Sequence, residues 1–358
     1  MIRLTKKQKW FKQQNLTKKD KIYVGLDVHK KSISVAIWLN GQIELTFNAS
    51  ADYARLIKQL RPIQKAIKLV VYEAGPTGYG LARTMEKAKI PVQVISPANT
   101  PRPSKRRSKT DRLDCCELAE FAAKGLLKPV TIPTEQEEAD RQLQRLRDQL
   151  VSKRRRIRQQ IKSFLLQHSI AEPDGLKGWS LAAIEELQLL PLNTALRFTL
   201  DMYLEEMAQI RIYLENTEAE LQALSLQKRH RRAMKILRSH PGVGPVTAWA
   251  FRLEIFRPDR FDQGTEVAGF LGLAPRISQS GQTTREGPIV KTGRPQLRSK
   301  LIEASWVWIR YDAQARKVYN RLCSNTGNAN KAIVAMARRL AIRLWKMLCD
   351  GQLYRQAG

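Results

Sequence analysis

The stretch Ile22-Tyr23-Val24-Gly25-Leu26-Asp27-Val28 decides the fold of the N-terminal part of this chain. It is apolar along nearly its whole length, a pattern typical of a buried β-strand. Two more strand-like segments follow at residues 32–39 and 43–47, and the dipeptide Asn40-Gly41 between them favours a hairpin turn. We therefore predict three antiparallel strands at the start of the fold.

The next part of the chain alternates between helix and strand. A short helix is predicted at about residues 52–60, and the apolar run Ile67 to Tyr72 suits a buried parallel strand. A helix at about 77–89 and a short strand at 92–95 follow. Three antiparallel strands followed by this alternation predict an α/β, RNase H-like (RuvC-like) domain with a mixed sheet, over residues 21–130.

Two boundaries enclose this domain. Residues 1–20 form a basic N-terminal segment before it. A predicted helix at 111–124 closes the domain, and Pro129 and Pro133 then mark a boundary, so a new domain is expected to start at Thr134.

The rest of the chain is predicted to be mainly helical. Within residues 134–230, apolar residues recur every seven positions at Leu143, Leu150, Ile157 and Phe164. A second series alternates by fours and threes through Leu196, Leu200, Tyr203, Met207, Ile210, Leu214, Thr217, Leu221 and Leu224. These heptads predict a coiled-coil linker and oligomerisation region, paired within the chain or between subunits. Residues 231–350 are expected to form a mainly α C-terminal domain.

Composition points to a nucleic-acid partner. The 358 residues include 63 Lys and Arg against 33 Asp and Glu, a formal net charge of +30. Such a field attracts a polyanion. No stretch approaches the roughly 20 apolar residues of a membrane-spanning helix, and no apolar run follows the basic N-terminus as in a secretory signal. The four cysteines lack metal-type spacing. We expect a cytoplasmic, nucleoid-associated protein without a membrane partner.

Four acidic residues could form a metal site. Asp27 lies in the middle of an apolar strand and Glu73 at the end of another, where an unpaired charge is costly to bury. Asp111 and Asp114 are spaced i, i+3, on one face of a helix. Each could instead be a satisfied core, ion-pairing or capping residue. Together they predict a carboxylate site for Mg²⁺, with Mn²⁺ as the alternative, suited to phosphoryl transfer.

A basic run immediately precedes the last two acids. Lys105, Arg106, Arg107 and Lys109 could hold a phosphate backbone against a metal site. The alternative is an ordinary solvated charge run.

A glycine-containing turn could contact nucleic acid. The segment His240-Pro241-Gly242-Val243-Gly244-Pro245 lies between two predicted helices, the helix-hairpin-helix pattern. Gly242 and Gly244 would let the backbone approach a phosphate, and the next helix N-terminus offers free N–H donors. A plain helix–helix turn is the alternative.

A polar loop at residues 277–285 could expose a nucleophile. A serine hydroxyl needs a base or a metal to become nucleophilic, and Ser278 and Ser280 cannot be separated by spacing alone. An ordinary surface loop is the alternative. Three basic residues could steady a phosphate here: Arg276, Arg285 and Lys291.

These pieces together resemble the DEDD transposases of bacterial insertion sequences, the IS110/IS1111 family of bridge-RNA-guided recombinases. The resemblance covers roughly residues 21–348. It is carried by Gly25-Leu26-Asp27-Val28-His29-Lys30, Tyr72-Glu73-Ala74-Gly75-Pro76-Thr77-Gly78, Lys109-Thr110-Asp111-Arg112-Leu113-Asp114, Pro241-Gly242-Val243-Gly244, Leu271-Gly272-Leu273-Ala274-Pro275-Arg276, Ser280-Gly281 and Lys291-Thr292-Gly293.

The resemblance implies roles for five residues. Asp27, Glu73, Asp111 and Asp114 would be the four metal-binding acids, and Ser280 the nucleophile that forms a phosphoserine–DNA intermediate before strand exchange. This chain has Gln279 and Gln282 where the family commonly has a serine and a glycine, which leaves Ser278 as an alternative. Cys115 stands where alanine is expected.

The resemblance also implies partners. Donor and target DNA would be selected by a structured noncoding bridge RNA, and dimers would join into a tetramer in which one subunit supplies the acids and another the serine. Two other functions stay open: a RuvC-like junction nuclease that uses activated water, and a non-enzymatic nucleic-acid binder.

Overall fold

A computed structural model describes residues 6–13, 16, 20–98, 100–101, 111–280, 283–291 and 293–356. The chain forms two compact units, Met1–Ile132 and Pro133–Gly358, and each is described by itself. The further division of the second unit at residue 231 stays a prediction.

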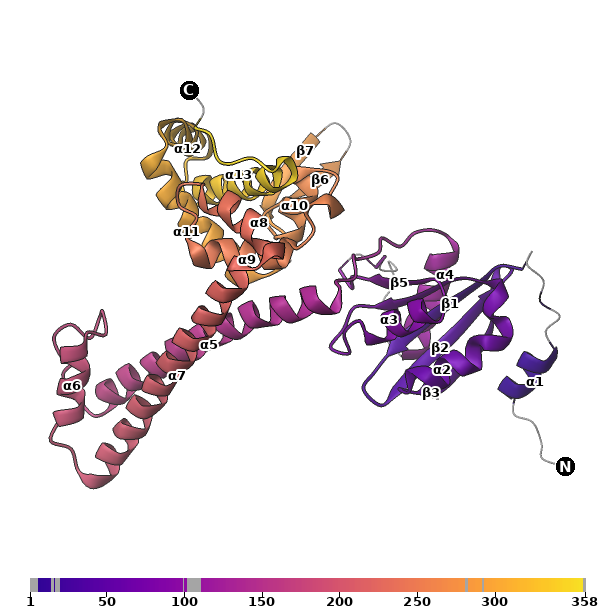
Figure 1. The fold of residues 1–358 in the computed structure, drawn as a ribbon, viewed down its shortest axis with the longest axis horizontal. Coiled ribbons are helices and arrows are strands. Elements are labelled where there is room, and N and C mark those ends of the chain that lie inside the picture. The colour runs from indigo at the N-terminus through magenta and orange to yellow at the C-terminus, as the bar shows by residue number, and fades with distance from the viewer. Residues whose placement is uncertain are drawn as a thin grey trace. The chain divides into compact units, whose positions relative to one another are not determined.

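The first unit is built on a five-stranded sheet in the order β3-β2-β1-β4-β5 (Figure 1). The strands β1 (Ile22–Val28), β2 (Ser32–Leu39) and β3 (Gln42–Ser50) are antiparallel neighbours. The strands β4 (Ile67–Glu73) and β5 (Val92–Ile95) run parallel to β1. The predicted mixed α/β sheet is confirmed, and Asn40 and Gly41 form the predicted turn with φ of 45° and 110°.

Helices cover both faces of this sheet. The helices α2 (Tyr53–Leu60) and α3 (Gly80–Lys87) pack on alternate side chains such as Leu26 and Tyr72. The helix α4 (Asp111–Ala123) packs on the opposite face, against Ala36 and Val71. Because successive residues of a strand point to opposite faces, this division decides which side chains share a face with α4.

The basic N-terminal segment contains the helix α1 (Lys6–Gln13). Trp10 and Phe11 pack against the first unit's core, and the Phe11 ring lies 6.2 Å from that of Phe47. The Lys7 ammonium stands 3.9 Å from the centre of the Phe47 ring. Part of the predicted basic segment is therefore attached to the sheet domain.

Two 33-residue helices begin the second unit, α5 (Glu135–Gln167) and α7 (Thr194–Leu226). They pack side by side in opposite directions, with the short α6 (Leu181–Leu189) between them in sequence (Figure 1). Thr134 begins α5 with a capping box. The predicted seam residues that are buried are Leu150, Ile157, Phe164, Leu200, Met207, Ile210, Leu214, Thr217, Leu221 and Leu224.

The remainder of the second unit is mostly helical, as predicted. Its elements are α8 (Lys228–Arg238), α9 (Pro245–Ile255), a 3₁₀ turn (Pro258–Arg260), α10 (Gly264–Phe270), β6 (Pro275–Ser280), β7 (Thr283–Ile289), α11 (Pro295–Tyr311), α12 (Ala313–Thr326) and α13 (Ala329–Asp350). One prediction needs correction: the polar loop at 277–285 is part of a β-hairpin. Among the described residues, no helix is long and apolar enough to span a bilayer.

Candidate active site

The close packing of α4 on β1 defines the candidate site. A Cβ on Gly25 would lie 2.0 Å from the carbonyl oxygen of Cys115 and 2.6 Å from the amide nitrogen of Ala119. Only glycine leaves enough room for this contact. Asp27 follows Gly25 by two positions, so its side chain belongs to the same face of the sheet as α4.

Strand register brings Glu73 to the level of Asp27. Leu26 on β1 pairs with Tyr72 on the parallel strand β4, so the residues that follow them lie side by side at the carboxyl ends of the two strands. Since Tyr72 is buried with the α2 and α3 face, Glu73 belongs to the α4 face. Both predicted acids therefore lie at one edge and on one face of the sheet.

The first turn of α4 lies near these two acids. Asp111 begins this helix and Asp114 directly precedes Cys115, which contacts the sheet at Gly25. The pKa of the Cys115 thiol is raised above its usual range by a hydrogen bond with Cys116, by burial and by the nearby Asp27 carboxylate. That last effect places Asp27 within electrostatic reach of α4. The side chain of Asp111 lies outside the described part of the structure.

Other polar residues extend the site, and sequence reasoning missed them. Asp27 pairs with Ser34 on β2, which pairs with Asn48 on β3, and the Ser34 hydroxyl donates a 3.1 Å hydrogen bond to the Asn48 amide oxygen. Ser34 is only 8% exposed. A polar row thus crosses four strands at one level, through Glu73, Asp27, Ser34 and Asn48. The available signal was a serine inside a strand that is otherwise apolar from Ile33 to Leu39.

Both acids on the sheet already have polar neighbours. The His29 Nε2 atom lies 3.0 Å from Oδ2 of Asp27. The Thr100 hydroxyl donates a 2.7 Å hydrogen bond to Oε1 of Glu73. Asp27 is 21% exposed in its side chain, so the pair with His29 is open to solvent. These contacts hold the carboxylates at the edge of the sheet.

The donor set fits a hard divalent cation. Asp27, Glu73 and Asp114 supply carboxylate oxygens from three elements on one face, and oxygen ligands are those that Mg²⁺ prefers. Within the described residues, however, no three His, Cys, Asp or Glu side chains are close enough together to hold a metal ion. Asp27, Glu73 and Asp114, three of the four predicted ligands, therefore lie toward one end of the sheet but do not form a coordination site among the described residues.

Four predicted basic contacts cannot be placed. Lys105, Arg106, Arg107 and Lys109 lie outside the described residues.

The predicted serine region is a two-stranded hairpin in the second unit. Ser278 pairs with Arg285 and Ser280 pairs with Thr283, which puts Ser280 at the end of β6 beside the turn. The side chains of these four residues lie outside the described part. Pairing with Thr283 therefore gives Ser280 a backbone partner on the neighbouring strand.

The hairpin is closed at its base by a backbone hydrogen bond, and the segment after it contacts two helices. The Val290 amide donates a 2.9 Å hydrogen bond to the Ala274 carbonyl oxygen. Gly293 has a φ of +73°, and a Cβ there would lie 2.2 Å from the Phe270 carbonyl oxygen. The next residue, Arg294, pairs at 3.3 Å with Glu254, a carboxylate only 7% exposed. Exposed Arg276 and Lys291 stand at the base of the hairpin.

The predicted DNA-contacting turn joins α8 to α9, and its two glycines differ. Gly242 has a φ of +85°, and its Cβ would lie 2.3 Å from the Ala304 carbonyl oxygen on α11. Its lack of a side chain therefore serves packing inside the protein. Gly244 is exposed at the N-cap of α9 with no atom within 4 Å of a built Cβ. Of the two, Gly244 has the open approach that a phosphate would need.

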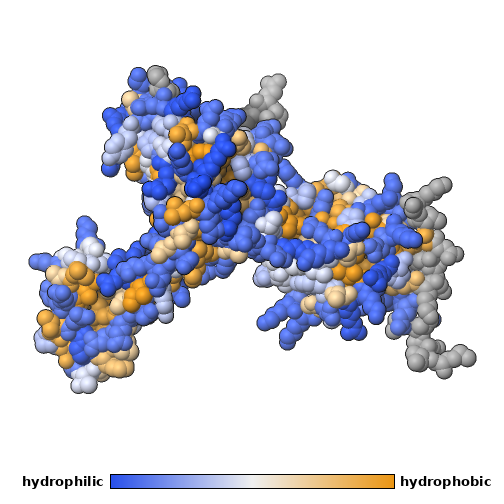
Figure 2. Space-filling model, in the orientation of Figure 1, coloured by the Kyte–Doolittle hydropathy of each residue, from blue (hydrophilic) through white to orange (hydrophobic). Residues whose placement is uncertain are grey.

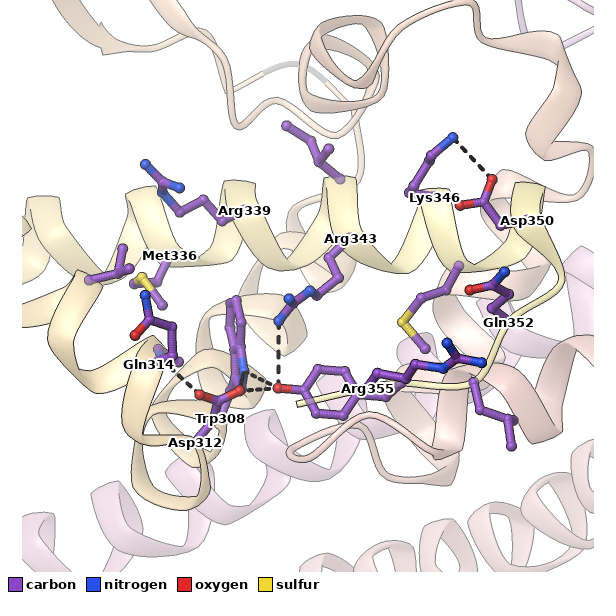
Figure 3. Close-up of a pocket in the computed structure, with 16 residues that line it drawn as sticks. Trp308, Asp312, Gln314, Met336, Arg339, Arg343, Lys346, Asp350, Gln352 and Arg355 are labelled. Carbon is purple, nitrogen blue, oxygen red and sulfur yellow. Dashed lines mark hydrogen bonds and ion pairs between the residues drawn. The ribbon is translucent and has the colours of Figure 1, made fainter. Parts of the chain in front are cut away.

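A cluster of aromatic and polar side chains packs around His240, the first residue of this turn segment. The His240 ring packs 5.0 Å from the Trp308 ring and 4.4 Å from the Tyr354 ring. Trp308 donates a 3.2 Å hydrogen bond to Asp312, and the Tyr354 hydroxyl also bonds to Asp312 (Figure 3). Burial is the main reason that the pKa of His240 falls to about 4. The neutral ring donates from Nδ1 to the Pro241 carbonyl oxygen at 2.7 Å.

Comparison with known proteins shows that this chain matches two transposase family models. Residues 24–170 match a DEDD transposase family model, and residues 234–320 match the model described as Transposase IS116/IS110/IS902 family. A Sinorhizobium fredii protein described as a transposase, y4qE, is 31% identical over 304 residues, which cover 83% of this chain and 74% of that protein. The transposase for insertion sequence element IS1533 of Leptospira borgpetersenii is 29% identical over 342 residues, 92% of this chain and 96% of the relative.

A third relative is similar along nearly its whole length. The transposase for insertion sequence element IS1111A of Coxiella burnetii is 25% identical over 358 aligned residues, 96% of this chain and 94% of the relative. The four acids lie within the first matched region and Ser280 within the second.

Proposed function

This chain belongs to the IS116/IS110/IS902 family of insertion-sequence transposases, and we propose that its acidic sheet edge and its serine hairpin together cut and rejoin DNA. The observation that carries the proposal is the placement of Asp27 and Glu73 at one level, on the face covered by α4. Carboxylates gathered at the carboxyl ends of adjacent strands suit metal-assisted phosphoryl transfer.

In this proposal Asp27, Glu73, Asp111 and Asp114 hold the metal. When bound there, Mg²⁺, or Mn²⁺ in its place, would neutralise charge on the scissile phosphate and favour the ionised form of an attacking hydroxyl. Asp111 and Asp114 come from a helix that the Gly25 contact fixes against the sheet, which supports their assignment to one site with Asp27 and Glu73. Because no three of the described acids lie close enough to hold an ion, metal binding would have to draw their carboxylates together.

Ser280 would be the nucleophile. Its hydroxyl proton would pass to solvent as its Oγ forms a bond to phosphorus. The bond from phosphorus to the leaving DNA strand would break, and the leaving oxygen would take up a proton from solvent to become a hydroxyl end. A hydroxyl end of another strand then attacks the phosphoserine and releases the serine. Arg276, Arg285 and Lys291 would stabilise the phosphate charge during both steps. The Lys105–Lys109 run and Gly244 would hold the DNA backbone.

The remaining parts of the proposal concern partners. We propose that a structured bridge RNA selects donor and target DNA and that subunits assemble into dimers and tetramers. Exposed apolar residues on α5 to α7 support self-association, because Leu166, Leu189 and Phe198 are 82%, 82% and 65% exposed. Figure 2 shows hydrophobic residues at the surface around the α6 end of this helical pair. A cytoplasmic, nucleoid-associated location stays a prediction from the sequence.

The experiment that tests this function is a cleavage assay with purified protein, RNA transcribed from the element's noncoding end, and labelled donor and target DNA. We expect strand cleavage that requires Mg²⁺ or Mn²⁺ and that disappears in Asp27→Asn, while DNA binding persists. Cleavage that survives Ser280→Ala would favour the water-using nuclease. Binding without any cleavage under all metal conditions would favour the non-enzymatic binder.

A further inference from the structure

A small basic pocket lies on the helical pair, away from the serine hairpin in sequence. It has a volume of about 220 Å³ and is formed by one stretch of α5 and by Trp179 from the loop before α6. This volume is below the roughly 300 Å³ at which pockets for drug-sized ligands begin. The lining residues are Val151, Arg154, Arg155, Arg158, Gln159, Lys162 and Trp179.

The pocket has positive charge without matching negative charge. Lys162 pairs with Glu172 at 2.6 Å. In the described ranges no carboxylate pairs with Arg154, Arg155 or Arg158, and the buried Nε of Arg158 has no hydrogen-bond partner. Burial, together with the charge of Arg154, lowers the pKa of Arg158. Guanidinium groups that line one pocket without a paired carboxylate favour the binding of an anion.

Two other cavities contain basic residues that are paired with acidic ones. In one, of about 580 Å³, Lys346 pairs with Asp350 at 3.0 Å, and Arg343 contacts the Tyr354 hydroxyl (Figure 3). In the third, about 380 Å³, Arg229 pairs with Asp140 at 2.9 Å. In the α5 pocket, by contrast, the one described ion pair involves Lys162 and none of the three arginines.

Trp179 is held in place at a conformational cost. Its φ is +59°, in the left-handed region that bulky residues rarely adopt. Its amide donates a 3.2 Å hydrogen bond to the carbonyl oxygen of Leu176, which is buried. The guanidinium of Arg158 lies 5.0 Å from the centre of the Trp179 ring. Backbone strain that holds an aromatic ring against an arginine indicates a preorganised site.

We infer that this pocket binds a phosphate group of a polynucleotide backbone. The inference rests on the proposed function, since it takes nucleic acid to be the substrate, but it needs neither the acids nor the serine. Arg154 and Arg158 would contact the phosphate oxygens through their N–H groups, and Trp179 would keep Arg158 oriented. Such a contact tracks the backbone without reading the bases.

Fluorescence anisotropy tests the inference, with the full chain in EDTA so that no cleavage occurs. The probes are labelled single-stranded DNA, double-stranded DNA and single-stranded RNA of mixed sequence, each titrated at several salt concentrations. The test variant is Arg154→Gln with Arg158→Gln. The matched control is Lys153→Gln with Arg156→Gln, which removes the same charge from exposed positions of α5 that do not line the pocket.

For at least one probe, the test variant should raise Kd about tenfold above that of the control, the size of one lost charge-assisted contact. The slope of log Kd against log salt should fall by about one. The probe with the largest change identifies the nucleic acid. Equal effects of both double variants on all probes would overturn the inference, because general charge would then explain binding. Thermal unfolding of both variants checks that α5 remains folded.

The two proposals fail separately. If the pocket is wrong, the variants bind alike while Asp27→Asn still abolishes cleavage. If the proposed chemistry is wrong, cleavage survives Asp27→Asn and Ser280→Ala while the pocket variants still differ in binding.

Discussion

Gly25 on β1 lies directly against Cys115 on α4, so closely that a Cβ at Gly25 would stand 2.0 Å from the Cys115 carbonyl oxygen. This contact fixes how near the first turn of α4 comes to the carboxyl end of β1. Asp27 lies two residues after Gly25, and Asp114 lies one residue before Cys115. The packing of one glycine therefore sets the separation of two proposed metal-binding residues.

Substitution of Gly25 should disturb both stability and the site. We expect Gly25→Ala to lower the free energy of unfolding by about 1–3 kcal/mol, because the added methyl group overpacks a backbone contact. Denaturant unfolding measures this change. Gly75→Ala is the control, since the nearest atom to its built Cβ lies 4.0 Å away. Equal stability of the two variants would show that α4 does not pack as described.

Metal binding should depend on Asp27 directly. We expect Asp27→Asn to weaken Mn²⁺ binding by at least about 100-fold, since even the residues that orient metal ligands are worth 10- to 100-fold. Electron paramagnetic resonance of free Mn²⁺, with DNA present, measures this without any turnover. Asp174→Asn serves as the control, because Asp174 is exposed in the loop before α6. Unchanged Mn²⁺ affinity in Asp27→Asn would remove Asp27 from the ligand set.

Substitution of the two glycines in the α8–α9 turn should have different effects, one on stability and the other on DNA binding. Gly242→Ala should destabilise the protein by about 2 kcal/mol or more, through its left-handed φ and the collision with α11. Gly244→Ala should leave the unfolding temperature nearly unchanged and weaken DNA binding in an anisotropy assay. If Gly244→Ala binds DNA like the wild type, the turn is a plain helix–helix connection.

Stability should fall in mild acid because of His240. Burial lowers its pKa from 6.5 to about 4, so between these values the unfolded chain binds more protons than the folded one. Stability is therefore fully present above pH 6.5 and should decrease as the pH falls toward 4, by up to about 3 kcal/mol. Urea unfolding of His240→Asn should show a weaker pH dependence in this range. His168→Asn, at an exposed position, should keep the wild-type dependence.

Strand patterns and heptads made much of the fold predictable. The strands β1 and β4 and the Asn40-Gly41 turn are determined by residues that are neighbours in sequence. A short stretch of sequence is therefore enough to predict them. The helix at Ala313–Thr326 was not predicted individually, although Ala315, Val318, Tyr319 and Leu322 pack against the core at helical spacing. The serine hairpin was expected to be a loop because its strands are polar, and pairing between them is a non-local property.

The acidic residues of the candidate site could be predicted from the sequence, but the polar residues around them could not. Asp27 and Glu73 stand out because charges rarely occur at such positions in apolar strands. Ser34, Asn48 and Thr100 join them only through strand register and loop closure, which no short stretch of sequence contains. Likewise, Gly242 resembles a phosphate-binding glycine in sequence, whereas its close neighbour in space is α11.

The central claim is that Ser280 attacks DNA with help from the acidic sheet edge, and peptide mapping of the trapped protein–DNA adduct tests it most directly. After nuclease and trypsin digestion, the peptide from Ile277 to Arg285 should bear a nucleotide remnant. Fragmentation should place the remnant on Ser280, and the adduct should be absent from Asp27→Asn. A remnant on Ser278, or DNA cleavage with no adduct on this peptide, would contradict the account.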